Sequence, residues 1–229
     1  SNGGAAEFYG VFAKTDPTQR SRGVTAFLVR KGSEGLSFGA PMKKMGQRAM
    51  VNCEVFFDGV FVADEDRLGD EGQGFYGLMH TFDASRAILG AAATGTARAA
   101  TELALEYAQQ REQFGKKIIE QSVWEQRIGE ARTNIEMTRL LCLKAADMMD
   151  KVGNKTAQLE IAMIKVAAPN IALKIIDDAI QAFGAAGVSD EAGLAKSYAG
   201  IRTLRLADGP DEVHNRAIAR LELRKYSNH

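Results

Sequence analysis

Two carboxyl groups near the start of the last helical stretch could act as an acid or a base. Asp208 precedes the pair Gly209-Pro210, and Glu212 would lie about one turn into the helix that follows. An Asp at the start of a helix often serves as an N-cap, because its carboxylate accepts bonds from free backbone N–H groups. A carboxylate that is shielded from water can instead remove a proton from a substrate. The residue types alone leave both roles open for Asp208, whereas Glu212 more readily pairs with an arginine.

Two further segments end long helical stretches, and each carries a residue whose role the residue types leave open. Arg111 follows a long helical stretch, where its planar guanidinium could bind phosphate oxygens or complement the helix dipole. Gln181, Phe183 and Gly184 end another helical stretch. A glycine there either lets a ligand approach the backbone closely or simply caps the helix.

The composition excludes several classes of function. Lys plus Arg and Asp plus Glu both number 29 in the 229 residues, and no basic block argues for a nucleic-acid partner. No apolar run approaches the ~20 residues that a membrane span needs. His80, His214 and His229 lack the spacing of metal ligands. Cys53 and Cys142 lie in segments of different kinds, which favours two buried, reduced thiols and a reducing compartment.

The first third of the chain has the pattern of β-structure. Residues 6–15, 23–30 and 51–62 are rich in Phe, Val and Tyr, with apolar residues at nearly alternate positions. Turn residues separate these stretches, and a glycine-rich joint covers 68–74. Because the chain lacks an initiator Met and enters a strand pattern almost at once, we expect it to be part of a longer protein.

The remainder has a helical period. Helices are predicted over about 75–110, 119–151, 154–184 and 190–206, with a shorter helix from the Asp208 segment to about 224. Long helices joined by short loops pack as antiparallel neighbours. The sequence therefore predicts an α+β chain, in which residues 1–70 form part of a middle β-domain and residues 71–229 form a helical-bundle domain.

Four motifs then narrow the family. They are "MGQRAMVNCEVFFDGVFVADEDRLGDEGQGF" (45–75), "REQFGKKI" (111–118), "DDAIQAFGAAGV" (177–188) and "LADGPDEVHNRAIAR" (206–220). In this order and spacing they resemble the acyl-CoA dehydrogenase family, nearest to the branch of family members ten and eleven. The resemblance covers nearly the whole chain and identifies it as the C-terminal part of such a protein.

The resemblance implies a fold, a cofactor and partners. It implies the end of a β-barrel-like middle domain followed by an antiparallel C-terminal four-helix bundle with a short final helix. FAD is the implied cofactor, acyl-CoA the substrate, and an electron-transfer flavoprotein a possible electron acceptor. A homo-oligomer, as a dimer or homotetramer, is expected. The implied setting is fatty acid β-oxidation, in the cytoplasm of a bacterium or in the mitochondrial matrix or peroxisome of a eukaryote.

The family reaction is α,β-dehydrogenation, in which a base removes an α-proton while the flavin accepts a hydride from the β-carbon. Asp208 aligns with the usual catalytic Glu, although its side chain is one methylene shorter. Some family members place the base on the first long helix, and the matching position here is Ser85, which cannot serve as a base. The resemblance therefore assigns the base to Asp208, with Glu212 in reserve.

The resemblance also implies binding residues. The cofactor-binding residues would be Ser1, Arg111, Gln113, Phe114, Ile118, Gln181, Phe183 and Gly184. The substrate-binding residues would be Phe82, Asp83, Arg86 and Gly209. One alternative stays open, because Asp83 and Arg86 could be an exposed ion pair at positions i and i+3 of a helix. The chain also departs from the family motif at Ala185, which replaces the usual second glycine.

Other functions share this fold. A non-catalytic flavoprotein partner subunit would complete a neighbour's site without turning over substrate. An acyl-CoA oxidase would share the chemistry but pass electrons to O₂. A DNA-associated relative would need a strip of positive surface charge. The balanced charge of this chain argues against that role.

Overall fold

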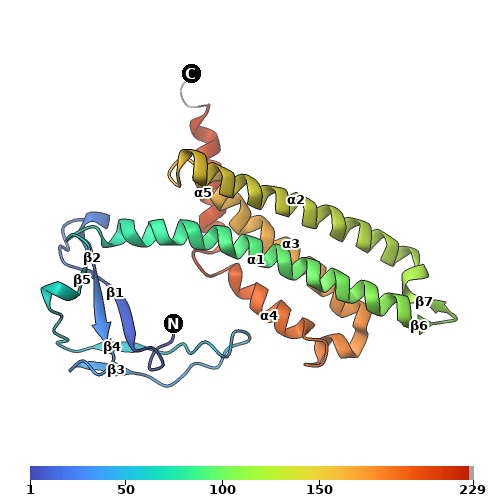
Figure 1. Ribbon diagram of the computed structural model, residues 1–229, viewed down its shortest axis with the longest axis horizontal. Helices are drawn as coiled ribbons and strands as arrows, with labels where there is room; N and C mark the ends of the chain where they lie inside the picture. The colour runs from blue at the N-terminus through green and yellow to red at the C-terminus, as the bar shows by residue number, and fades with distance from the viewer. Residues whose placement is uncertain (227–229) are drawn as a thin grey trace. The chain divides into compact units, whose positions relative to one another are not determined.

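The computed structural model describes residues 1–226 (Figure 1). The chain separates into two compact units, Ser1–Thr81 and a second unit from Phe82 onward.

The N-terminal unit contains two small antiparallel sheets. One sheet has the strand order β1-β2-β5 and the other pairs β3 with β4. Within the described residues these sheets do not close into a barrel. The strands are β1 (Phe8–Lys14), β2 (Val24–Arg30), β3 (Leu36–Phe38), β4 (Val55–Phe57) and β5 (Arg67–Leu68). Two short 3-10 helices, Ser21–Gly23 and Asp64–Asp66, connect them.

The first two strands follow the predicted apolar alternation. β1 alternates between exposed and half-buried residues, as a strand with one face on the core must do. In the register of β1 with β2, Phe8 lies opposite Arg30 and Lys14 lies opposite Val24. The predictions for 6–15 and 23–30 are therefore confirmed.

The third predicted strand, over residues 51–62, is wrong in its length. Only Val55–Phe57 is a strand, and β3, its partner, was not predicted. The preceding residues are held by separate hydrogen bonds, such as Gly39 N–H to the Glu54 carbonyl at 3.0 Å. A turn with Gly59 at φ 64° follows the strand. Aromatic and β-branched content indicated extension correctly, but it does not indicate where a partner strand is available.

The glycine-rich joint is needed where the chain passes close to β2. A Cβ added to Gly74 would lie 2.6 Å from the backbone nitrogen of Ala26. At Gly72, the Thr25 hydroxyl accepts a hydrogen bond from the backbone N–H at 2.9 Å. Only a residue without a side chain allows this approach. The joint thus fixes the start of the first long helix on the sheet.

The predicted helices are present, with ends shifted by a few residues. They are α1 (Gly74–Gln110), α2 (Ser122–Val152), α3 (Gln158–Phe183), α4 (Leu194–Leu204) and α5 (Asp211–Arg224). Between α1 and α2 lie a hairpin of β6 (Glu112–Gln113) and β7 (Lys116–Lys117) and the 3-10 helix Ile118–Glu120. A further 3-10 helix, Gly184–Val188, follows α3. The predicted α+β class with a C-terminal helical bundle is confirmed.

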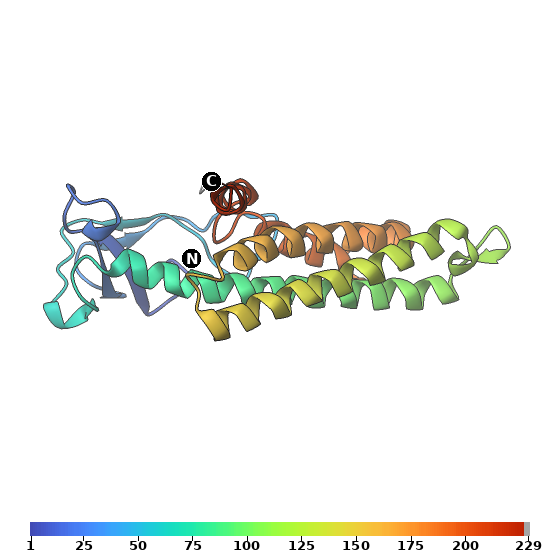
Figure 2. The same ribbon diagram turned by 90° about the horizontal axis from the view of Figure 1, so that it is seen from above.

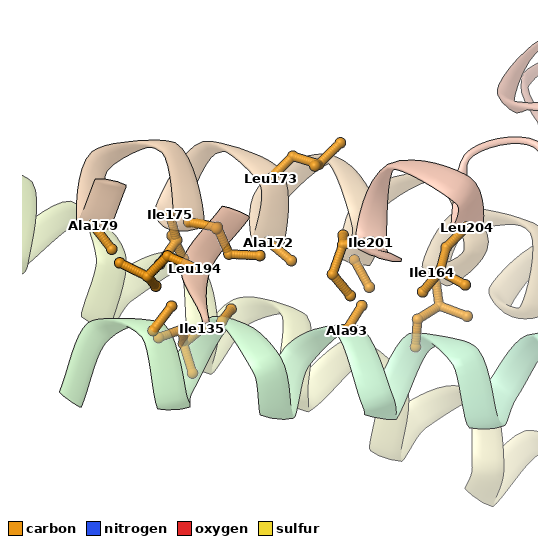
Figure 3. Packing of buried hydrophobic residues seen from close by; sticks show 14 of the residues in the cluster. Ala93, Ile135, Ile164, Ala172, Leu173, Ile175, Ala179, Leu194, Ile201 and Leu204 are labelled. Carbon is orange, nitrogen blue, oxygen red and sulfur yellow. The ribbon is translucent and has the colours of Figure 1, made fainter. Parts of the chain in front are cut away.

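Helices α1 to α4 share one hydrophobic core (Figures 2 and 3). α1 contributes Ala93, Ala97 and Ala100, which recur on one face and let its backbone approach its neighbours. α3 packs against α2, α4 and α5. Its apolar spacing of three and four residues predicts one buried face, which includes Ile161, Ile164, Ala168 and Ala179, but the helix is buried on more than that face. Leu173 and Ile176, outside the predicted face, are buried as well. The core of the second unit is thus organised around α3.

Both cysteines are free thiols, as predicted, but the prediction that they are buried is wrong, because each is only half-buried. Burial raises the pKa of the Cys142 thiol, which lies 3.7 Å from the Thr94 hydroxyl. Among residues 1–226, no helix has the length and apolar character that a membrane span requires.

Candidate active site

The loop between α4 and α5 places Asp208 in an unusual backbone conformation. Asp208 has φ 54° and Gly209 has φ 103°, so two consecutive residues lie in the left-handed region. Asp tolerates this region better than most side chains do. The N-cap of α5 is Pro210, and no side chain caps it. The alternative role of Asp208 as an N-cap is therefore wrong.

The Asp208 carboxylate is half-buried and hydrogen-bonded to α1. The Ser85 hydroxyl donates to Asp208 Oδ2 at 2.6 Å. Ser85 is the position at which some relatives were expected to carry the base. The two alternative positions of the base thus lie side by side, although 123 residues separate them in the chain.

Arg86 holds the main chain of the same residue. Its Nε and Nη2 donate to the Asp208 carbonyl at 3.2 and 3.1 Å. Its Nη1 forms an ion pair with Asp83 at 3.0 Å, with side-chain exposures of only 16% and 14%. The guanidinium also lies 5.7 Å from the ring centroid of Phe82. The pair is therefore not the exposed surface pair of the alternative interpretation, and Arg86 braces the loop.

His214, which the sequence analysis did not select for the site, contacts the loop from α5. Its Nε2 lies 3.1 Å from the Asp208 carbonyl. Because a carbonyl only accepts, Nε2 carries the hydrogen. A Cβ on Gly209 would lie 2.9 Å from that nitrogen, so this contact requires a glycine. Burial lowers the pKa of His214 below its usual value of 6.5.

This lowered pKa predicts a pH dependence of stability. The unfolded chain binds a proton at His214 more readily than the folded chain does, so the free energy of unfolding should fall as the pH drops below about 6.5. Urea unfolding at pH 7.5 and at pH 5.5 measures the loss. His214→Gln keeps an N–H donor and should reduce the loss, whereas His80→Gln, at an exposed position, should not. An equal loss in both variants would contradict the assignment.

A buried polar cluster lies behind the loop and was also missed. Lys165 of α3 is 0% exposed, and its Nζ donates to the carbonyls of Leu204 at 2.5 Å and Gly209 at 3.1 Å. Asp211 Oδ2 accepts from Arg205 Nε at 2.7 Å and Asn170 Nδ2 at 3.1 Å. Burial opposes ionisation of Asp211, but these bonds outweigh it and lower its pKa. A lysine inside the apolar run 161–169 of α3 was the signal available in the sequence.

A second site lies at the far end of the bundle from this loop. A cavity of about 520 Å³ is bounded by the end of α1, the hairpin, the start of α2 and the end of α3. Six of the residues predicted to bind the cofactor line it: Arg111, Gln113, Ile118, Gln181, Phe183 and Gly184. The structure therefore brings two separate motifs of the sequence together around one cavity.

Aromatic and cationic side chains that the sequence analysis missed complete this cavity. The ring of Phe183 stacks on Tyr107, with centroids 4.1 Å apart. The guanidinium of Arg127 lies 4.7 Å from the ring centroid of Trp124. Gly184, with φ 61°, is also the C-cap of α3. The capping role and the cavity-lining role of Gly184 are thus both realised.

Two predicted cofactor residues lie outside the cavity. Phe114 is fully exposed at the tip of the hairpin, with φ 55°. Ser1 belongs to the N-terminal unit, where its hydroxyl lies 3.5 Å from Asn52 Nδ2. Within residues 1–226, no group of three or more His, Cys, Asp and Glu side chains could hold a metal ion.

The comparison with protein families agrees with this arrangement. The model of the acyl-CoA dehydrogenase C-terminal domain matches residues 72–223. The chain belongs to the acyl-CoA dehydrogenase family. This matched range includes the Asp208 loop, the helices that brace it and the residues around the cavity.

Individual relatives of the chain support the family assignment. It is 43% identical over 199 residues to acyl-CoA dehydrogenase family member 11 of Rattus norvegicus, covering 86% of the chain and 26% of that protein. The solved butyryl-CoA dehydrogenase of Megasphaera elsdenii is 33% identical, with a TM-score of 0.88 over 97% of this chain and 57% of the other. The structure described as PigA with FAD and proline is 31% identical, with a TM-score of 0.91 over 97% and 58%. The chain spans about half the length, or less, of the curated relatives it matches.

Proposed function

We propose that the protein containing this chain dehydrogenates acyl-CoA thioesters between the α- and β-carbons, with Asp208 as the base. The observation that carries this proposal is the contact of the Asp208 carboxylate with Ser85 in a half-buried loop that Arg86, His214 and Lys165 fix. A base must be held at a defined place relative to the proton it removes. This loop meets that requirement.

The two carboxylate oxygens of Asp208 have different roles in this proposal. Oδ2 accepts the hydrogen bond of Ser85 and fixes the side-chain orientation. Oδ1 receives the proton from the α-carbon. Phe82 and the Asp83–Arg86 pair lie within one turn of Ser85 on α1 and would border the approach to the carboxylate. FAD, when bound, supplies the acceptor of the hydride that leaves the β-carbon.

The cavity at the other end of the bundle fits part of an FAD molecule. Arg111 and Arg127 supply positive charge for phosphate oxygens, and Gln113 and Gln181 supply amide groups that donate and accept. The stacked rings of Tyr107 and Phe183 offer an aromatic wall beside these polar groups. A relative of the same fold has been solved with FAD. Because the cavity and Ser85 lie far apart along α1, these residues would hold the FAD of a neighbouring copy.

The family also supports three further proposals, on the domain division, the number of subunits and the electron acceptor. We propose a division into a β-domain over residues 1–70 and a helical-bundle domain over 71–229, a homo-oligomer of two or four subunits, and an electron-transfer flavoprotein as the acceptor. A chain in the solved structure described as the electron transferring flavoprotein of Acidaminococcus fermentans is 33% identical to this chain, with a TM-score of 0.89. Sedimentation of the purified protein measures the number of subunits.

A spectroscopic experiment tests the proposed activity. The protein is purified with FAD, its visible flavin spectrum is recorded without oxygen, and butyryl-CoA is added. Bleaching of the flavin band and formation of the α,β-unsaturated thioester are the expected results, because the hydride reduces the flavin. A protein that binds FAD but is not bleached by acyl-CoA thioesters of short, medium or long chain would contradict the proposal and favour the non-catalytic partner.

A further inference from the structure

A fully buried lysine joins the two ends of the Asp208 loop. Lys165 lies on α3 and is 0% exposed. Its single ammonium group donates to the Leu204 carbonyl, at the end of α4, and to the Gly209 carbonyl, just before α5. The residues between these two acceptors form the loop that carries Asp208. Lys165 therefore holds the backbone at both the start and the end of that loop.

The position of this ammonium has a clear electrostatic reason. Leu204 is the last residue of α4, and the final carbonyls of a helix have no partner within the helix. These carbonyls carry partial negative charge, which a cation stabilises. A buried cation without such acceptors would be strongly unfavourable. Lys165 and the end of α4 therefore compensate each other, and the ammonium cannot move without leaving both carbonyls unpaired.

The other side chains that contact the loop bind different atoms of it. Arg86 and His214 both bind the Asp208 carbonyl, one residue before Gly209, and have no bond to the Leu204 end of the loop among those described. Asp211, which also lies close enough to interact with Lys165, is bonded to Arg205 and Asn170. The Arg205–Asp211 pair also spans the loop, and the Asp211 N–H donates to the Arg205 carbonyl at 3.2 Å. Lys165 differs from this pair because it reaches both ends of the loop from a separate helix, α3.

We propose that Lys165 is a positioning residue for dehydrogenation: it holds the loop from Leu204 to Gly209 in the conformation that presents the Asp208 carboxylate to the substrate. This inference rests on the proposed function of Asp208. Lys165 touches neither substrate nor cofactor and acts through the backbone of the loop. Its loss should reduce turnover through misplacement of the base, while the binding of acyl-CoA and FAD stays almost unchanged.

The test uses Lys165→Met, which keeps an unbranched side chain but removes the ammonium, and Lys165→Gln, which keeps a shorter donor. In the FAD-loaded protein we expect kcat for acyl-CoA to fall by about 10²-fold in Lys165→Met, because misplacement of about 1 Å costs that much. KM and flavin content should stay within about twofold. Amide hydrogen exchange over residues 205–209 should quicken, since the loop opens locally more often.

Lys174→Met is the matched control, because Lys174 lies on the same helix and its ion pairs with Glu130 and Asp178 are partly exposed. It should leave kcat and loop exchange unchanged. A folded Met or Gln variant with wild-type kcat and wild-type loop exchange would overturn the proposal. Failure of both variants to fold would assign Lys165 to the core alone and overturn it too. If the wild-type protein does not turn over acyl-CoA, the proposed function fails, whereas loop exchange still decides whether Lys165 holds the loop.

Discussion

Asp208→Asn should lower the turnover of acyl-CoA by about 10²–10⁴-fold, the usual contribution of a general base. The carboxamide has almost the same shape as the carboxylate, and its oxygen can still accept the hydrogen bond of Ser85. It cannot take up a proton at neutral pH. The flavin content and the unfolding midpoint should therefore stay close to those of the wild type, while anaerobic bleaching by acyl-CoA becomes slow. Stopped-flow absorbance of the flavin band measures the rate.

Glu212→Gln is the matched control for this substitution. Glu212 lies in the first turn of α5 and is exposed, and it is the other carboxyl group near the loop that the sequence put forward. Its amide variant should bleach at the wild-type rate. If Asp208→Asn bleaches as fast as the wild type, Asp208 is not the base, and a slow Glu212→Gln variant would transfer the role to Glu212.

Ile164→Ala should destabilise the helical unit by about 2–5 kcal/mol, because it removes a fully buried side chain and leaves a cavity. Ile164 of α3 points toward α1 in the core (Figure 3). A Cβ added to Gly90 of α1 would lie 2.6 Å from Ile164 Cγ1 and 2.8 Å from Cδ1. The isoleucine thus fills the space over a glycine, and this space is the reason for the large effect. Chemical denaturation measures the free energy of unfolding.

The same contact predicts that a second substitution, Gly90→Ala, changes the stability in opposite directions in the wild type and in Ile164→Ala. In the wild type, Gly90→Ala should destabilise by about 1–3 kcal/mol, because it overpacks the contact with Ile164. In the Ile164→Ala background, the added methyl group enters the cavity and should stabilise the protein. Gly95→Ala, on the same helix with open space around it, should stabilise by about 0.5–1 kcal/mol in both backgrounds. Equal effects of Gly90→Ala in the two backgrounds would contradict this account of the packing.

The long helices could be predicted because their apolar residues repeat over many turns. In α2, the spacing of three and four residues predicts that Ile135, Thr138 and Ala145 share one face, and these residues are buried. The short strands could be predicted less well, since a strand of three residues such as β4 depends on whether a partner strand lies beside it. The sequence of residues 51–62 indicates an extended chain but contains no information about its partner.

The candidate site was predictable in its motifs and not in its contacts. Asp208, Arg86 and the residues around the cavity follow from motifs that resemble a known family. The bond from Ser85 to Asp208 joins positions far apart in the chain, and no local pattern predicts it. Lys165 and His214 were missed because a charged or titratable residue on a helix is usually solvated. Only the tertiary packing shows that both face the loop.

The carbonyl of residue 208 is bound by two N–H groups of Arg86 and one of His214. These bonds hold the main chain, so the path of the loop depends little on the functional group of residue 208, provided that the residue tolerates a positive φ. A lineage can therefore exchange the functional group at this position, or lose it, without rebuilding the surrounding scaffold. Such a site is open to evolutionary change in chemistry while the architecture that supports it is inherited intact.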